Sequence, residues 1–238
     1  MSLRPGAAKA RAAALHLYTA SGAALAFLAA VEICAPDPDP RPVFLLLALA
    51  VLVDATDGPL ARRWEVKRWL PAIEGRTIDD LVDYLTYTFV PLLLVWRMGW
   101  VPEPRMLWVV PALLASLFGF AHTGIKDEAG GFFLGFPSYW NVVAFYAGLI
   151  HHHYGSTINA AAITLLALAT VLPIRFLYPN LAPRPWRAPV IVGALIWLVA
   201  MLCMLPAYPR IPAWAGWLSL LYPVFYVGLS FRLDRQRR

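Results

Sequence analysis

Long, nearly uninterrupted apolar runs dominate the chain, separated by short segments rich in proline or charge. About 20 consecutive apolar residues are needed for a helix to cross the roughly 30 Å hydrocarbon core of a bilayer. Eight runs reach or approach that length, and they predict transmembrane helices over residues 12–33, 43–61, 79–96, 107–123, 138–154, 156–177, 189–205 and 211–231. We therefore expect an all-α, polytopic integral membrane protein with about eight transmembrane helices, built as a single membrane domain over residues 1–238.

Composition supports this class. Of the 238 residues, 60% are hydrophobic and 14% are charged, whereas a soluble domain has about 45–50% and about 25%. These values exclude a disordered chain, a coiled coil and an ordinary soluble domain. The net charge of +6 does not indicate a nucleic-acid partner, because basic residues in membrane proteins mainly set topology and contact lipid. Asn159 and Ser219, which are polar residues inside apolar runs, are expected to hydrogen-bond between helices.

The distribution of Lys and Arg predicts the orientation. With eight spans, sixteen of the 20 basic residues fall on the side that holds both termini, and only Arg41, Arg97, Arg105 and Arg210 fall on the other. Cytoplasmic loops carry an excess of Lys and Arg. We therefore expect both termini in the cytoplasm, with residues 1–12 forming a cytoplasmic N-terminal segment.

Four aspartates interrupt the second and third apolar runs: Asp54 and Asp57 in one, Asp79 and Asp83 in the other. A charge inside a bilayer costs at least about 2.5–3.5 kcal/mol, so four cost on the order of 10 kcal/mol unless they are neutralised. The spacings of three and four place each pair on one helix face. Both pairs fall at a similar depth near the cytoplasmic surface. A divalent cation that prefers oxygen ligands, Mg²⁺ or Mn²⁺, would neutralise them.

Other roles for these carboxylates stay open. Asp79 or Asp80 alone could cap a helix, although Asp80 lies about 100° from the face that Asp79 and Asp83 share. The aspartates could also line an ion path in a cation transporter. Transporters often have two related halves, and the last four runs contain no second acidic pair. The sequence therefore favours a metal site over a transport path.

Written out, the motif is Asp54-x2-Asp57-Gly58-x2-Ala61-Arg62-x12-Gly75-x3-Asp79-x3-Asp83. It resembles the signature of the CDP-alcohol phosphatidyltransferases. Its twelve-residue spacer is longer than in most of that family and is similar to that of the phosphatidylcholine synthase branch. Residues 16–22 and 135–146 also resemble that branch, so the resemblance covers essentially the whole chain.

The resemblance implies a role for each matching residue. Asp54, Asp57 and Asp79 would bind the metal, Mn²⁺ or Mg²⁺, and Asp83 would both bind metal and act as the general base. His16 and Thr19 occupy positions where family members often carry an Asn-x-x-Thr stretch close to the nucleotide. The residues implied in binding the CDP-lipid are His16, Thr19, Gly58, Ala61, Arg62, Gly75 and Lys126.

The resemblance also implies a reaction, in which CDP-diacylglycerol and choline give phosphatidylcholine and CMP in a bacterial-type inner membrane. Choline carries a quaternary ammonium, which aromatic faces hold best. The aromatic candidates near the motif and the fifth run are Tyr84, Tyr87, Tyr139, Trp140 and Tyr146. Serine, glycerol phosphate or an inositol compound stays open as the acceptor. The partners are the two substrates, the phospholipid bilayer and, because dimerisation is common in this family, a second copy of the chain.

Overall fold

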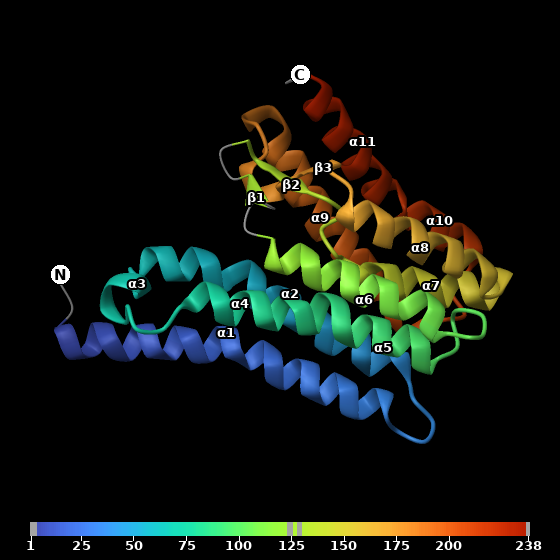
Figure 1. Ribbon diagram of the computed structural model, residues 1–238, viewed down its shortest axis with the longest axis horizontal. Coiled ribbons are helices and arrows are strands. Elements are labelled where there is room, and N and C mark those ends of the chain that lie inside the picture. The colour runs from blue at the N-terminus through green and yellow to red at the C-terminus, as the bar shows by residue number, and fades with distance from the viewer. Residues whose placement is uncertain (1–3, 123–125, 128–129, 237–238) are drawn as a thin grey trace. The chain divides into compact units, whose positions relative to one another are not determined.

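The computed structural model describes residues 4–122, 126–127 and 130–236; the side chains of 126 and 127 are outside the description. The chain divides into two compact units, Met1–Leu94 and Val95–Arg238, which are treated separately below. Helices make up most of both units (Figure 1). The all-α expectation is therefore confirmed apart from three short strands.

Four helical segments within the described residues are long and apolar enough to cross a membrane: Pro5–Ile33, Pro40–Arg63, Arg184–Ala207 and Ala213–Arg235. Two further apolar helices, Met106–Ala121 and Thr157–Val171, are shorter. The protein is thus a helical membrane protein. The number of eight spans stays a prediction, because the other expected spans do not combine this length and hydropathy in one helix.

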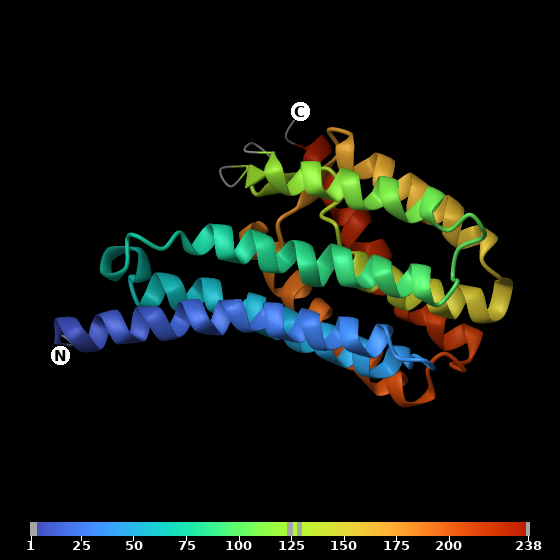
Figure 2. The same cartoon turned by 60° about the horizontal axis from the view of Figure 1, so that its bottom comes forward.

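The first unit contains a helical hairpin and a third, composite helix. Its elements are α1 (Pro5–Ile33), α2 (Pro40–Arg63), the short α3 (Val66–Trp69), α4 (Gly75–Asp83), the π-helix η1 (Tyr84–Phe89) and α5 (Val90–Arg97), which continues past the end of the unit. Figure 2 shows α2 returning along α1 after the turn between them. Helix α1 also packs against α3, α4 and η1, so it is the common support of this unit.

The buried face of α1 explains how one helix can contact several others. Its buried residues recur at alternating steps of three and four, and most of them are small: Ala8, Ala12, Leu15, Thr19, Gly22, Ala26, Ala29 and Ile33. Small side chains let helix backbones approach closely, which is how helices gain packing energy where lipid is the solvent. One close approach is at Gly22, where an added Cβ would collide with Cγ1 of Val82 in α4.

The third helix of this unit changes its winding in the middle. Residues 75–97 form one continuous helical segment, in which the π-helical turns of η1 separate α4 from α5. In a π-helix each N–H bonds the carbonyl five residues back instead of four, and such turns occur frequently at functional sites. The sequence predicted a regular helix over residues 79–96, so the π turns are a finding of the structure.

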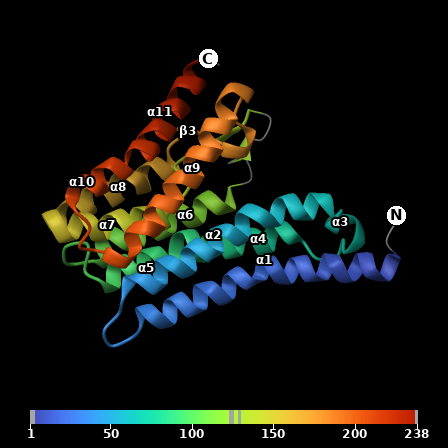
Figure 3. The same cartoon turned by 180° about the vertical axis from the view of Figure 1, so that it is seen from behind.

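The second unit contains the remaining helices and a small sheet. Its elements are α6 (Met106–Ala121), β1 (Lys126–Asp127), β2 (Phe132–Leu134), α7 (Trp140–Tyr154), α8 (Thr157–Val171), β3 (Arg175–Leu177), η2 (Pro179–Leu181), α9 (Arg184–Met204), η3 (Leu205–Ala207), α10 (Ala213–Ser219) and α11 (Leu221–Arg235). Within this unit α6 packs on α8, and α11 packs on α9. Figure 3 shows α9, α10 and α11 from behind.

One predicted boundary in this unit is wrong, and proline accounts for it. The helix expected over residues 156–177 ends at Val171, because Pro173 disfavours helical backbone at Leu172, whose ψ is 147°. The span expected over 211–231 is present as Ala213–Arg235, with an interruption at Leu220 between α10 and α11. Pro223 has no N–H to donate to the preceding turn, which accounts for the interruption.

The three-stranded antiparallel sheet joins connections that are far apart in the sequence. Strand β2 pairs with β1 on one side and with β3 on the other. Helix α11 packs on β3, where Ser230 Oγ accepts from the backbone N–H of Leu177 at 3.0 Å and Tyr226 donates to the carbonyl of Leu177. The α6–α7 connection, the α8–α9 connection and the end of α11 therefore lie together. The predicted alternation of spans requires these three segments to lie on the same face of the membrane.

Candidate metal centre

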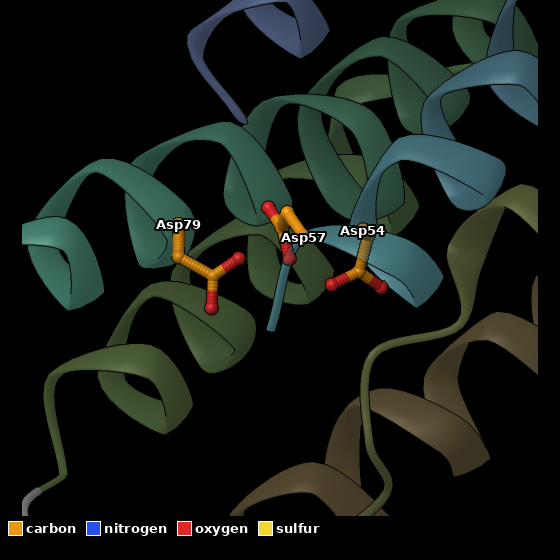
Figure 4. A group of neighbouring side chains, drawn as sticks. All are labelled: Asp54, Asp57 and Asp79. Atoms are coloured by element: carbon orange, nitrogen blue, oxygen red, sulfur yellow. The ribbon is translucent and has the colours of Figure 1, made fainter. Parts of the chain in front are cut away.

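Three of the predicted carboxylates converge in the first unit. Asp54, Asp57 and Asp79 each offer one carboxylate oxygen, and these three oxygens all lie within 4.8 Å of one another. Figure 4 shows Asp57 between the other two, with all three side chains directed toward a common point. Asp57 is 6% exposed, and the other two are half-buried. The prediction that the two helices bring their carboxylates together is confirmed for these three residues.

The packing of α1 explains this convergence. Asp54 and Asp57 lie one turn apart on α2, and Asp79 lies on α4, while α1 packs against both of those helices. The absence of a side chain at Gly22 lets Val82 of α4 lie against α1. The position of Asp79 relative to α2 therefore depends on the contact between Gly22 and Val82, in which none of the three aspartates takes part.

Neighbouring side chains orient the carboxylates. Tyr87 donates a hydrogen bond from its hydroxyl to Oδ2 of Asp54 at 2.7 Å. The hydroxyl of Thr19 and the backbone N–H of Gly58 lie near the carboxylate of Asp57. The bond from Tyr87 orients the carboxylate of Asp54 before any ion binds.

The donor set fits a hard divalent cation. Ligand oxygens of Mg²⁺ lie 2.0–2.1 Å from the ion, so two of them can be at most about 4.2 Å apart. The oxygens of the three aspartates, all within 4.8 Å, come close to this separation, and small side-chain rotations close the difference. Carboxylate oxygens without sulfur or nitrogen ligands favour Mg²⁺ or Mn²⁺ over softer metals. Three negative charges held this close inside a membrane also require a counter-charge.

The other two aspartates of α4 have different surroundings. Asp83 is the last residue of α4, and its Oδ1 is buried, but it is not one of the three clustered residues. Asp80 is near Arg76, with 3.7 Å between Nε and Oδ2. The N-cap of α4 is Glu74, so Asp79 and Asp80 lie inside the helix and the capping alternative is wrong. The roles of Asp83 as ligand and base stay predictions.

Comparison with known proteins decides the family. No family model matches the chain. It is 36% identical over 223 residues to a phosphatidylcholine synthase of Pseudomonas aeruginosa, covering 93% of this chain and 91% of that protein. Phosphatidylcholine synthases of Rhizobium meliloti (36% identical, 87% and 84% covered) and Legionella pneumophila (31%, 91% and 86%) are also similar. The chain belongs to the phosphatidylcholine synthase family. The predicted branch of the larger transferase family is thereby confirmed.

Three further residues implied by membership in this family lie near the end of α2, beyond Asp57. Gly58, Ala61 and Arg62 follow on the same helix, and Ala61 and Arg62 line an open surface depression of about 390 Å³. Glu65, Val66, Lys67 and Arg68 complete its lining, and Arg68 forms a 3.0 Å ion pair with Glu65. Three of the six lining residues are basic, so the depression can attract a phosphate-bearing ligand.

His16 and Gly75 are in contact with each other. An added Cβ at Gly75 would lie 3.0 Å from Cε1 of His16, so glycine at this position makes room for the imidazole. Nε2 of His16 is buried and, among the described residues, has no hydrogen-bond partner. The structure therefore brings two members of the predicted CDP-lipid set together at the start of α4. Thr19, another member, lies near the clustered carboxylate of Asp57 instead.

The predicted aromatic candidates have diverse surroundings. Tyr84 and Tyr87 lie in the π-helix of the first unit, and both are half-buried. In the second unit Trp140 is completely buried and donates from Nε1 to Ser116 at 2.7 Å, and Tyr139 packs against the core of that unit. Tyr146 hydrogen-bonds with Ser219 at 2.9 Å. The side chain of Lys126 is outside the described residues.

Sequence reasoning missed the bond between Tyr87 and Asp54. It placed Tyr87 only among the aromatic candidates for a cation. One signal was available, because Tyr87 follows Asp83 by four residues, as Asp83 follows Asp79. That spacing predicts a shared helix face, although a regular α-helix drifts along such a series.

Proposed function

We propose that this protein is a phosphatidylcholine synthase, which transfers the phosphatidyl group of CDP-diacylglycerol to choline and releases CMP. The observation that carries this proposal is the cluster of three carboxylate oxygens within 4.8 Å, in a chain that belongs to this family. The reaction would take place at the cytoplasmic side of a bacterial inner membrane. The apolar helices and the bacterial relatives support that location.

Asp54, Asp57 and Asp79 would hold Mn²⁺ or Mg²⁺ against the diphosphate of the substrate. When bound, the ion neutralises charge on the phosphate oxygens and stabilises the leaving CMP. Thr19 would help to keep the carboxylate of Asp57 in place, because its hydroxyl lies near that group. Arg62, exposed at the end of α2, would bind phosphate oxygens through two parallel N–H donors.

Asp83 would act as the general base. A hydroxyl is a weak nucleophile until its proton is removed, and a carboxylate within reach can accept that proton. The choline oxygen would then form a bond to the phosphorus that carries diacylglycerol, and the bond from that phosphorus to the CMP oxygen would break. The position of Asp83 one turn beyond Asp79 on α4 supports this assignment, since it places the base next to the metal ligands.

Choline recognition would use aromatic faces and negative charge. Its quaternary ammonium has no N–H to donate, and it is attracted by ring faces. Tyr84 and Tyr87 follow the carboxylates on the same continuous helical segment. Their rings are the aromatic faces in the first unit that we assign to the acceptor.

The decisive experiment supplies the purified protein with CDP-diacylglycerol and, in parallel, labelled choline, serine, glycerol phosphate or inositol. We expect CMP release and labelled lipid with choline only, loss of both in a chelator, and recovery with Mn²⁺ or Mg²⁺. Asp79→Asn serves as the inactive control. Labelled lipid from another acceptor, with none from choline, would refute the assignment of choline. Full activity in a chelator would refute the metal mechanism.

Orientation is a separate proposal. We propose that both termini are cytoplasmic, as the excess of basic residues on their side predicts. The sheet supports it, because it gathers the α6–α7 and α8–α9 connections with the end of α11. Reporter fusions at the C-terminus and in the α9–α10 connection should give opposite results, with the C-terminal one cytoplasmic. Equal results would contradict the predicted alternation.

A further inference from the structure

A tyrosine outside the family motif contacts one of the three clustered carboxylates. The hydroxyl of Tyr87 lies 2.7 Å from Oδ2 of Asp54, although the two residues are 33 positions apart in the chain. Both side chains are half-buried. A hydrogen bond to a carboxylate is shorter and stronger than one between neutral groups. In a partly dry environment this contact strongly restricts the rotation of the Asp54 side chain.

The π-helix explains why Tyr87 can reach Asp54. In a regular α-helix each residue turns by about 100°, so positions 79, 83 and 87 would drift progressively around the axis. The turns of η1 begin at Tyr84. Because a π turn contains more residues than a turn of α-helix, each residue turns by less than about 100° around the helix axis. The side chain at position 87 therefore returns toward the face that Asp79 presents, and α2 contacts η1 there.

We propose that Tyr87 is a positioning residue for the metal ligand Asp54, and that the π-helical turns of η1 exist to bring its hydroxyl there. An ionised carboxylate has about four lone-pair sites, so it can accept a bond from Tyr87 and bind an ion at the same time. Such outer partners of metal ligands typically change metal affinity or activity by about 10–100-fold. The inference rests on the proposed function, since it assumes that Asp54 binds the ion.

The test is Tyr87→Phe in the full-length protein purified in detergent, with Mn²⁺ as the probe. Phenylalanine keeps the aromatic face and removes only the hydroxyl. We expect Mn²⁺ binding, measured from the free-ion paramagnetic resonance signal, to weaken by about 10–100-fold. The Mn²⁺ concentration for half-maximal activity should rise by the same factor.

The matched control is Thr86→Val. Thr86 lies in the same π-helix, is buried, and donates its hydroxyl to the carbonyl of Val82 at 3.0 Å. This substitution also removes one hydroxyl and one hydrogen bond from η1, but not one that ends on a carboxylate. We expect its Mn²⁺ affinity to match that of the original protein. If Mn²⁺ binding weakens as much in Thr86→Val as in Tyr87→Phe, the effect is due to general damage to η1. That result would overturn the proposal.

The remaining outcomes separate this inference from the proposed function. Unchanged Mn²⁺ binding in Tyr87→Phe, with an original protein that binds Mn²⁺ and uses choline, would overturn the positioning role alone. A raised KM for choline with unchanged Mn²⁺ binding would do the same and assign the hydroxyl to the acceptor. An original protein that binds Mn²⁺ but transfers nothing to choline would refute the proposed function and leave the positioning role standing. An original protein that binds no Mn²⁺ would refute both.

Discussion

The two units of the protein differ in the polar groups that they bring together. In the second unit, the buried side chains of Asn159 and Ser116 find neutral partners: Asn159 donates to the carbonyls of Trp100 at 2.7 Å and Ala147 at 2.8 Å, and Ser116 accepts from Trp140. The bond between Tyr146 and Ser219 joins α7 to α10 in the same manner. The first unit instead brings three carboxylates within 4.8 Å of one another.

This difference teaches which polar residues are structural. The predicted interhelical roles of Asn159 and Ser219 are confirmed. Carboxylates that converge in a membrane repel one another, and the hydroxyl of Tyr87 supplies a dipole to Asp54. We therefore infer that the first unit is arranged for a cation and the second for packing, and substitutions in each should differ accordingly.

The largest effect is expected at the cluster itself. Asp57→Asn removes a charged ligand, so turnover should fall by more than about 100-fold. That is the upper end of the loss expected for a residue that only contacts a metal ligand. Release of CMP from CDP-diacylglycerol at saturating Mn²⁺ measures it. Asp80→Asn is the control, since Asp80 faces Arg76 and lies outside the cluster. It should stay within about twofold, and equal losses in both variants would contradict the assignment of the cluster.

The next effect concerns the contact that sets the register of α4. Gly22→Ala places a methyl group against Cγ1 of Val82, so α1 and α4 must separate or Val82 must move. Overpacking of this kind typically costs about 1–3 kcal/mol. We expect a lower midpoint of thermal unfolding in detergent and weaker Mn²⁺ binding. The double variant with Val82→Ala should recover most of both, and simple additivity of the two changes would show that the contact does not matter.

A smaller effect, confined to stability, is expected in the second unit. Asn159→Ala removes two hydrogen bonds to backbone carbonyls. Hydrogen bonds between membrane helices contribute about 0.6 kcal/mol on average and up to about 1.7. The midpoint of thermal unfolding should fall, while the Mn²⁺ concentration for half-maximal activity stays unchanged. A shift in that concentration would remove the distinction between the two units.

The smallest effect is expected at the start of α2. The Asp39 side chain caps this helix by accepting from the backbone N–H of Arg41 at 2.9 Å. Asp39→Ala should cost about 0.5 kcal/mol, the low end for such caps, because the site is exposed. It should leave metal binding unchanged, and a denaturation curve measures the loss.

The contribution of Asp39 should depend on pH. The hydrogen bond and charge of the Arg41 side chain hold the pKa of Asp39 below its ordinary value, which is about 3.9. A carboxyl with a depressed pKa in the folded state stabilises fully above the ordinary value, and its contribution is lost as pH falls through the folded pKa. The stability difference between the original protein and Asp39→Ala should therefore be constant between about pH 5 and 7 and vanish in stronger acid. A difference that persists there would refute the assignment.

Much of this organisation could be predicted from the sequence. Apolar run length fixed the helical membrane class, because a backbone in lipid must satisfy its own hydrogen bonds. The spacing of Asp54 and Asp57 placed both on one face of α2, because the helix period is a local property. Gly155, with a φ of 82°, ends α7 at the break that the apolar runs predicted between residues 154 and 156.

The tertiary structure decided how the faces meet. Which carboxylates converge depends on the packing of α1 against both α2 and α4, and the contact at Gly22 involves a residue 60 positions away, which no local pattern encodes. The π-helical winding of η1 could not be predicted for the same reason, because residue spacing does not encode it. Local periodicity thus determined what each helix presents, and long-range packing determined that Tyr87 would present its hydroxyl to Asp54.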